Sequence, residues 1–282
     1  MSNISEYLFK TDAVKICPQN QPFWYTSGKI GPYYINAHFI YGDEEQANSL
    51  LKLIDEEENK QELPKKIFQE ELAHYNERRI FKDVIDQTLE FIKDNINIDE
   101  IDYISGGERR DWFFSNILAY MLEKPHISIF KDLSSIIHSS DFSQVLDITD
   151  LKGANILHVA DLITEAVSFT RAWVPAINSL NGKMTHSVAI VDRLQGGEAA
   201  LAAVGVKALA IVNIDYSLFL KALEMSVINK EQLDMLNDYT ADPDGTMKKF
   251  IAEHPEFLES ALKADEKTAS RAKLCIDSKF YE

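Results

Sequence analysis

The feature that most constrains the fold is the alternation of short apolar runs with helix-length segments along residues 101–212. Five runs have the length of buried strands: 101–105, 126–131, 155–160, 184–191 and 207–212. Segments 112–122, 168–180 and 196–204, which lie between these runs, carry apolar residues at helical spacing. Strands joined by helices pair in parallel through right-handed crossovers. The sequence therefore predicts an α/β fold with one mostly parallel sheet flanked by helices.

The segments outside this core are expected to be mainly helical. Residues 3–14 have the pattern of a short amphipathic helix, and residues 43–95 repeat apolar positions at helical spacing within an acidic sequence. Residues 132–152 are polar and carry few structure signals. Beyond Asp215 we expect helices to the end of the chain, interrupted by a turn at 239–245.

The charge balance excludes some partners. Lys and Arg number 29 against 45 Asp and Glu, which gives a net charge of −16 and argues against nucleic acid or an anionic membrane. No apolar run approaches the ~20 residues that a membrane span requires. Only Cys17 and Cys275 occur, and the N-terminus lacks a signal-peptide pattern, so a cytoplasmic protein is expected.

Two strand-to-helix junctions have the features of anion sites. Backbone N–H groups in such a junction point at a bound anion, and segment 161–168 contains Asp161, Thr164 and Ser168 after an apolar run. Segment 106–111 reads Gly-Gly-Glu-Arg-Arg-Asp, in which Arg109 and Arg110 suit a diphosphate. The alternative interpretation of 106–111 is an ordinary turn between a strand and a helix, with exposed charges. Glu108 and Asp111 favour this alternative, because their negative charges partly cancel those of the arginines.

Three segments together resemble the type I phosphoribosyltransferases, in particular the orotate phosphoribosyltransferases. They are the hairpin 23–36, the strand and turn 156–168, and segment 190–205, which begins Ile-Val-Asp-Arg. The resemblance implies the family's core sheet within residues 1–216, with an N-terminal hood and a helical insertion at about 43–95. Residues 217–282 would form a helical C-terminal extension.

The resemblance also implies roles for particular residues. Phosphoribosyl diphosphate (PRPP) would contact Asp161 through its ribose hydroxyls, the turn carrying Thr164 and Ser168 through its 5-phosphate, and Arg109 and Arg110 through its diphosphate. The base would lie beside Tyr33 and Tyr34, with its carboxylate on Arg193, unless Arg193 instead pairs with Asp192 or Glu198. Lys29 would contact a phosphate or carboxylate, unless it is merely exposed. Lys131 and His138 fall in the region of the family's catalytic loop.

Two departures from the family pattern leave the activity open. Ala160 stands where the family has an acidic residue, and the turn reads Glu165-Ala166-Val167 without a glycine, so that Glu165 could occupy the phosphate site itself. The expected functions are phosphoribosyl transfer from PRPP to orotate or a related base, ligand binding without efficient transfer, as a sensor or partner subunit, or transfer from a less phosphorylated donor. Mg²⁺ would arrive with the diphosphate, since the histidines lack metal-ligand spacing. A homodimer is expected.

Overall fold

The computed structural model describes residues 3–281, which cluster into two compact units. Of the described residues, the first unit comprises 3–13 and 37–214, and the second comprises 14–36 and 215–281. The division expected from the sequence, at 216/217, differs from this grouping, because the structure joins the hairpin segment to the C-terminal helices.

A six-stranded sheet forms the centre of the first unit, in the order β10-β9-β8-β5-β6-β7. All neighbours pair in parallel except β6 and β7. The five strands predicted from the apolar runs all belong to this one sheet, which confirms the predicted α/β architecture. The strands are β5 (Tyr103–Gly107), β6 (His126–Ile129), β7 (Ser135–His138), β8 (Asn155–Ile163), β9 (Lys183–Asp192) and β10 (Lys207–Asn213).

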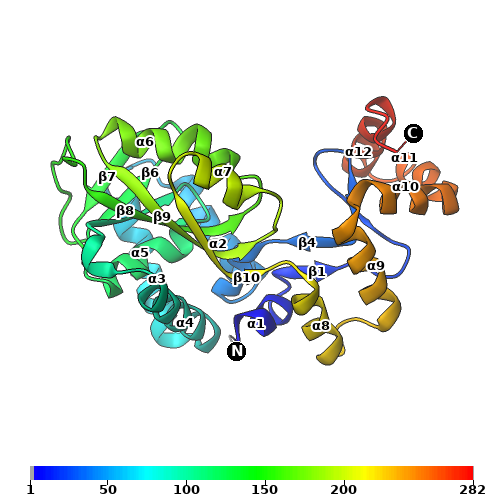
Figure 1. Cartoon of the computed structure of the whole chain (residues 1–282), viewed down its shortest axis with the longest axis horizontal. Coiled ribbons are helices and arrows are strands. Elements are labelled where there is room, and N and C mark those ends of the chain that lie inside the picture. The colour runs from blue at the N-terminus through cyan, green and yellow to red at the C-terminus, as the bar shows by residue number, and fades with distance from the viewer. Residues whose placement is uncertain (1–2, 282) are drawn as a thin grey trace. The chain divides into compact units, whose positions relative to one another are not determined.

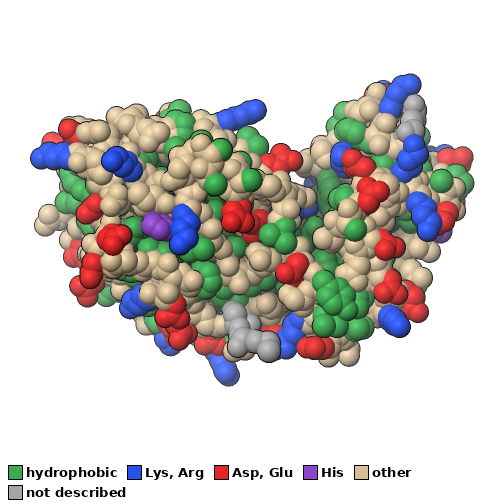
Figure 2. All heavy atoms as spheres, in the orientation of Figure 1, with side chains coloured by type: hydrophobic (Ala, Val, Ile, Leu, Met, Phe, Trp, Pro, Cys, Tyr) green, Lys and Arg blue, Asp and Glu red, His purple; other side chains and the backbone are tan. Residues whose placement is uncertain are grey.

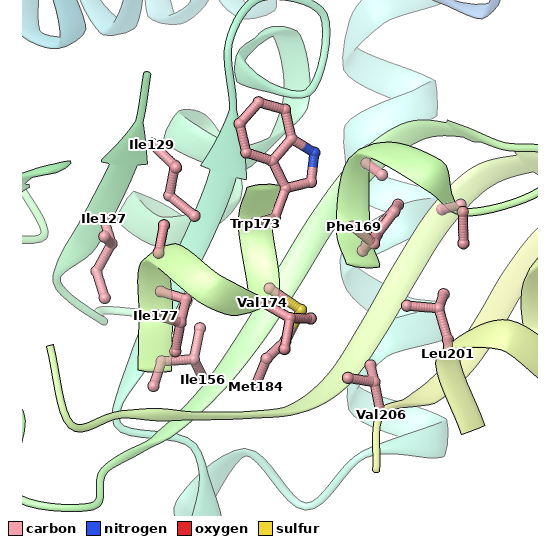
Figure 3. Close-up of a cluster of buried hydrophobic side chains, with 14 of the residues drawn as sticks. Ile127, Ile129, Ile156, Phe169, Trp173, Val174, Ile177, Met184, Leu201 and Val206 are labelled. Carbon is pink, nitrogen blue, oxygen red and sulfur yellow. The ribbon is translucent and has the colours of Figure 1, made fainter. Parts of the chain in front are cut away.

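Helices cover both faces of this sheet (Figure 1). On one face lie the π-helical turn η3 (Phe169–Trp173), α6 (Val174–Ser179) and α7 (Gly197–Ala203), and α5 (Trp112–Met121) packs on the other. Phe169, Trp173 and Ile177 bury their side chains against strand residues such as Ile156 (Figure 3). This apolar layer fixes the end of β8 and the turn that follows it.

The expected helical insertion is present in the first unit. Its elements are α2 (Glu44–Glu56), α3 (Leu63–Glu77) and α4 (Arg79–Asn95), and it is flanked by the 3-10 helices η1 (Ala37–Tyr41) and η2 (Ile98–Glu100). Helices α3 and α4 pack against α5, and α1 (Ile4–Lys10) packs against α4. Acidic and basic side chains are interspersed over the face of the molecule shown in Figure 2.

One strand was missed, and the predicted turn was wrong. Residues 132–152 contain β7, an antiparallel edge strand whose sequence Ser-Ile-Ile-His gave only a weak apolar signal. Residues 239–245 are mostly helical, because the chain breaks only at Asp242, whose carboxylate caps the next helix through Gly245 N–H at 2.9 Å. Strand β8 also runs three residues beyond the predicted end at 160.

The second unit combines short strands with helices. Strand β2 (Phe23–Trp24) pairs with β3 (Ile30–Gly31), whereas β4 (Tyr33–Ile35), beyond Pro32, pairs with β1 (Val14–Ile16). The predicted hairpin is thus divided between two small sheets. The helices of this unit are α8 (Tyr216–Glu224), α9 (Lys230–Ala241), α10 (Pro243–Glu253), α11 (Pro255–Leu262) and α12 (Glu266–Asp277). Among residues 3–281, no helix is long and apolar enough to cross a bilayer.

Candidate functional site

A pocket of about 340 Å³ opens at the carboxyl ends of β5, β6 and β8. Ligand sites in parallel sheets form at this edge, where the loops after neighbouring strands converge. Three segments line the pocket: the 106–111 loop, Lys131 after β6, and the 161–168 loop with η3 behind it. The lining residues are Gly107, Glu108, Arg109, Arg110, Asp111, Lys131, Asp161, Leu162, Thr164, Ala166, Val167, Ser168, Phe169 and Trp173.

Close packing brings the 106–111 loop against η3. A Cβ added at Gly107 would lie 2.3 Å from Cε2 of Trp173, so only glycine permits this approach. Glu108 then ties the loop to β6: its N–H donates to Ile129 O at 2.8 Å, and its carboxylate accepts the Lys131 N–H at 3.0 Å. The loop is therefore held by glycine packing on one side and by β6 on the other.

The cations of the pocket differ in how they are engaged. Arg109 is half-buried and pairs with Asp55 of α2. The ammonium of Lys131 lies 3.6 Å from the Glu108 carboxylate, and the side chain is largely exposed. Arg110 is exposed at the pocket wall. An exposed guanidinium can form a bidentate contact with phosphate oxygens without first losing a buried partner.

Asp161 is nine-tenths buried at the pocket wall. Burial and the neighbouring Asp111 raise the pKa of Asp161 to about 7, and Arg110 acts in the opposite direction. A carboxyl group with such a pKa sits in a site that lacks enough positive charge for its ionised form. A ligand that brings hydroxyl donors or a cation to Asp161 would stabilise the ionised carboxylate.

Residues 161, 162, 164 and 166–168 of the 161–168 loop line the pocket. Within residues 3–281, the N–H groups of 165–168 donate no hydrogen bond. Ala166 adopts a left-handed conformation with φ of +54°, which a glycine would adopt more easily. The side chain of Glu165 is exposed and is not among the lining residues, so it does not occupy the anion site in this structure.

Six of the residues predicted from the sequence line this one pocket: Arg109, Arg110, Lys131, Asp161, Thr164 and Ser168. Arg193 follows β9 directly, at the same edge of the sheet, and its N–H donates to Ile163 O at 3.0 Å. It is half-buried and does not line the pocket. His138 is buried, with its ring against Phe142 and Nε2 3.1 Å from Gln61 O, and burial lowers its pKa.

The remaining three predicted residues lie in the second unit, where each has partners of its own. The Lys29 ammonium binds both carboxylate oxygens of Asp244, at 2.8 and 2.9 Å. Tyr33 is buried between the rings of Phe219 and Tyr239. Tyr34, on the opposite face of the strand, is half-buried against the rings of Phe23 and Tyr25, as expected for alternate positions.

Sequence reasoning missed the part that Asp111 and His158 play. The sequence indicates Asp111 only as a charge that offsets the arginines, but its carboxylate is buried and accepts three hydrogen bonds within the pocket wall. A histidine in the middle of an apolar strand was the one available signal. Among residues 3–281, no group of three or more His, Cys, Asp or Glu side chains could hold a metal ion.

Comparison with curated proteins gives two sequence relatives. An orotate phosphoribosyltransferase of Sulfurisphaera tokodaii is 29% identical over 192 residues, 68% of this chain and 76% of the relative. One from Sulfolobus acidocaldarius is 23% identical over 218 residues, 77% of this chain and 87% of the relative. No protein-family model matches the chain.

Solved structures share the fold. A UMP synthase of Leishmania donovani superposes with a TM-score of 0.55 at 14% identity, over 85% of this chain but only 42% of that longer protein. An orotate phosphoribosyltransferase of Francisella tularensis superposes with a TM-score of 0.51 at 17% identity, over 83% of this chain and 95% of that one. These findings confirm both the recognised resemblance and the predicted fold.

Proposed function

For this relative of the type I phosphoribosyltransferases, we propose a phosphoribosyl-transfer function in which PRPP binds the 340 Å³ pocket and orotate or a related carboxylated base accepts the sugar. The convergence of six predicted residues on one polar pocket is the observation that carries this proposal. Both sequence relatives are orotate phosphoribosyltransferases, which favours orotate as the first base to test.

The diphosphate would bind at the 106–111 loop. Arg110 is exposed and presents guanidinium donors, and Arg109 and Lys131 line the same wall. Arg109 and Lys131 already pair with Asp55 and Glu108, so their contacts with the ligand would replace existing ion pairs. Arg110 is therefore expected to contribute most to diphosphate binding, because its contact with the ligand would not replace an ion pair such as those of Arg109 and Lys131.

The 5-phosphate would bind at the 161–168 loop, where N–H groups of 165–168 and the hydroxyls of Thr164 and Ser168 are available. Asp161 would accept hydrogen bonds from the ribose hydroxyls. The same carboxylate fits a Mg²⁺ ion that enters with the diphosphate, since Mg²⁺ commonly takes one or two protein carboxylates and keeps phosphate and water ligands. Such an ion would neutralise charge on the diphosphate.

The chemistry is a substitution at the anomeric carbon of the ribose. The bond from C1 to the diphosphate oxygen breaks through an oxocarbenium-like transition state, a bond from C1 to a ring nitrogen of the base forms, and pyrophosphate leaves. The nitrogen loses its proton to solvent or to the leaving group. Fixed donors at the 106–111 loop would stabilise the charge that develops on pyrophosphate. Arg193, at the same edge of the sheet, is the proposed partner of the base carboxylate.

Binding without efficient transfer is the second candidate, favoured by two observations. His138 is buried and does not line the pocket. Of the two residues expected to act from the catalytic-loop region, only Lys131 therefore lines it. The Lys131 ammonium is itself near Glu108. A protein of this kind would bind PRPP and act as a sensor or partner subunit.

We also propose the setting in which the protein works. Cys17 and Cys275 are free thiols, which suits a reducing compartment such as the cytoplasm, and the reaction would belong to pyrimidine nucleotide synthesis. Symmetric dimers are the commonest assemblies. A homodimer is therefore expected, and light scattering that gives the 32.1 kDa monomer mass at micromolar concentration would contradict it.

The test combines a thermal-shift panel with a turnover assay. The native chain is heated with PRPP, pyrophosphate, phosphate, orotate and orotidine monophosphate, each with and without Mg²⁺, and orotidine monophosphate formation is followed separately. Stabilisation by PRPP together with product formation supports transfer. Stabilisation without product supports the binding-only candidate. Absence of stabilisation by every phosphorylated compound would refute both.

A further inference from the structure

One side chain joins the two loops of the pocket. The Asp111 carboxylate accepts the Gly107 N–H at 3.0 Å through Oδ2 and the Asp161 N–H at 3.2 Å through Oδ1. Gly107 ends β5, and Asp161 lies near the end of β8, so one carboxylate spans two strands. Asp111 is only 7% exposed, and its oxygens are therefore bound by protein donors rather than by water.

The third donor to Asp111 is His158, and His158 in turn is oriented by Ser105. His158 Nε2 lies 3.2 Å from Asp111 Oδ2, and His158 Nδ1 lies 2.9 Å from Ser105 Oγ. Ser105 and His158 face each other in register on β5 and β8, and both are fully buried. Because a carboxylate can only accept, Nε2 carries the proton and Nδ1 accepts the Ser105 hydroxyl.

We propose that Ser105, His158 and Asp111 form a positioning relay that sets the spacing between the 106–111 loop and the 161–168 loop. This inference rests on the proposed function, because the spacing matters for a ligand that contacts both loops at once. PRPP is such a ligand, with its diphosphate on one loop and its ribose 5-phosphate on the other. Ser105 and His158 do not line the pocket, and their hydrogen bonds reach its wall through Asp111.

The surroundings of His158 explain why a smaller or apolar side chain would not serve. Its ring lies edge-on to Phe169 at 4.9 Å and beside Trp173, within the apolar layer of the sheet. Replacing it with leucine would remove one of the three donors to the buried Asp111 carboxylate, which is unfavourable. The carboxylate would then turn toward the pocket and release the N–H groups of Gly107 and Asp161.

Comparing the affinities for long and short ligands distinguishes a change in loop spacing from a general loss of stability. A ligand held at two points gains from the fixed distance between them, whereas a ligand held at one point does not. We therefore compare PRPP, which spans both loops, with pyrophosphate and ribose 5-phosphate, which each occupy one. The variants are His158→Leu, which removes the donor, and His158→Gln, whose side-chain amide offers both a donor and an acceptor.

Calorimetry in Mg²⁺ should separate these ligands. We expect His158→Leu to weaken PRPP binding about tenfold or more, since small misplacements are costly, and to change pyrophosphate and ribose 5-phosphate affinities less than about twofold. His158→Gln should retain PRPP affinity within about threefold of the native chain. An equal loss of affinity for all three ligands would overturn the relay.

Amide hydrogen exchange tests the relay without any ligand. His158→Leu should speed exchange at Gly107 and Asp161, and His158→Gln should restore the slow exchange, with Ser105→Ala as a milder variant should His158→Leu not fold. Unchanged exchange at both amides in the variants would overturn the inference. If the native chain fails to bind PRPP, the proposed function fails, and the exchange measurement still decides whether the relay exists.

Discussion

The two compact units hold their predicted ligand residues differently. In the first unit, Arg110, Asp161 and Thr164 face a shared pocket, and the backbone N–H groups beside them have no protein acceptor within residues 3–281. In the second unit, Lys29 and Tyr33 are engaged by side chains of that same unit. The pocket of the first unit therefore has hydrogen-bonding groups available to a ligand, whereas Lys29 and Tyr33 of the second unit already contact other side chains of that unit.

Of the changes considered, removing the Arg110 side chain should have the largest effect, which is on PRPP affinity. Loss of one charge-assisted phosphate contact costs about 1.5–3 kcal/mol, so Arg110→Ala should weaken PRPP binding about ten- to hundredfold. Arg79→Ala is the matched control, because Arg79 has a 90% exposed side chain that does not line the pocket. Calorimetry of both variants checks this, and equal affinities would remove the 106–111 loop from the site.

Filling the space at Gly107 should destabilise the first unit. The added methyl of Gly107→Ala would lie 2.3 Å from Trp173 Cε2, and overpacking of this kind costs about 1–3 kcal/mol. Denaturant unfolding measures the loss. Adding Trp173→Leu should recover part of it, and a fully stable Gly107→Ala variant would show that the loop does not need its close approach to η3.

Asp161 should make stability depend on pH. Its pKa rises from 3.8 to about 7 in the folded chain, so the native state holds the proton more tightly and the free energy of unfolding falls as pH rises through this window. Asp161→Asn removes that penalty. We expect the variant to gain roughly 1–2 kcal/mol over the native chain at pH 8, which is less than the full shift implies because Asp111 and Arg110 readjust, and the gain should disappear near pH 4.

Asp141 provides a control of opposite sign for this measurement. Hydrogen bonds from Ser139 and Ser143 lower the pKa of Asp141 to about 2, so its contribution to stability is present above pH 4 and is lost as pH falls toward 2. Asp141→Asn should therefore lose stability at neutral pH. The same pH trend for both variants would contradict the assigned environment of Asp161.

Lys29 should give the smallest effect. Its exposed pair with Asp244 and its position 5.5 Å from the Phe280 ring contribute under about 1 kcal/mol to stability. Lys29→Ala should slightly lower the melting temperature and leave PRPP affinity unchanged. A tenfold loss of PRPP affinity in this variant would break the comparison, because it would place a ligand contact in the second unit.

The same contrast explains what could be read from the sequence. The sheet was predictable because apolar runs mark buried strands, and parallel strands bring the 106–111 and 161–168 loops to one edge. The partners of Asp111 and Lys29 were not predictable, because they are set by tertiary packing. Asp111 meets Asp161 at a separation of 50 residues, and Lys29 meets Asp244 at a separation of 215. Edge strand β7 was missed because two isoleucines between a serine and a histidine carry little pattern.

Calorimetric titration of the unmodified chain with PRPP, in the presence and absence of Mg²⁺, tests the pocket most directly. We expect saturable binding at one site per chain, tighter with Mg²⁺ because the ion offsets the charges of the diphosphate and Asp161. No measurable heat at millimolar PRPP with Mg²⁺, or binding that Arg110→Ala leaves unaltered, would contradict the assignment of this pocket to PRPP.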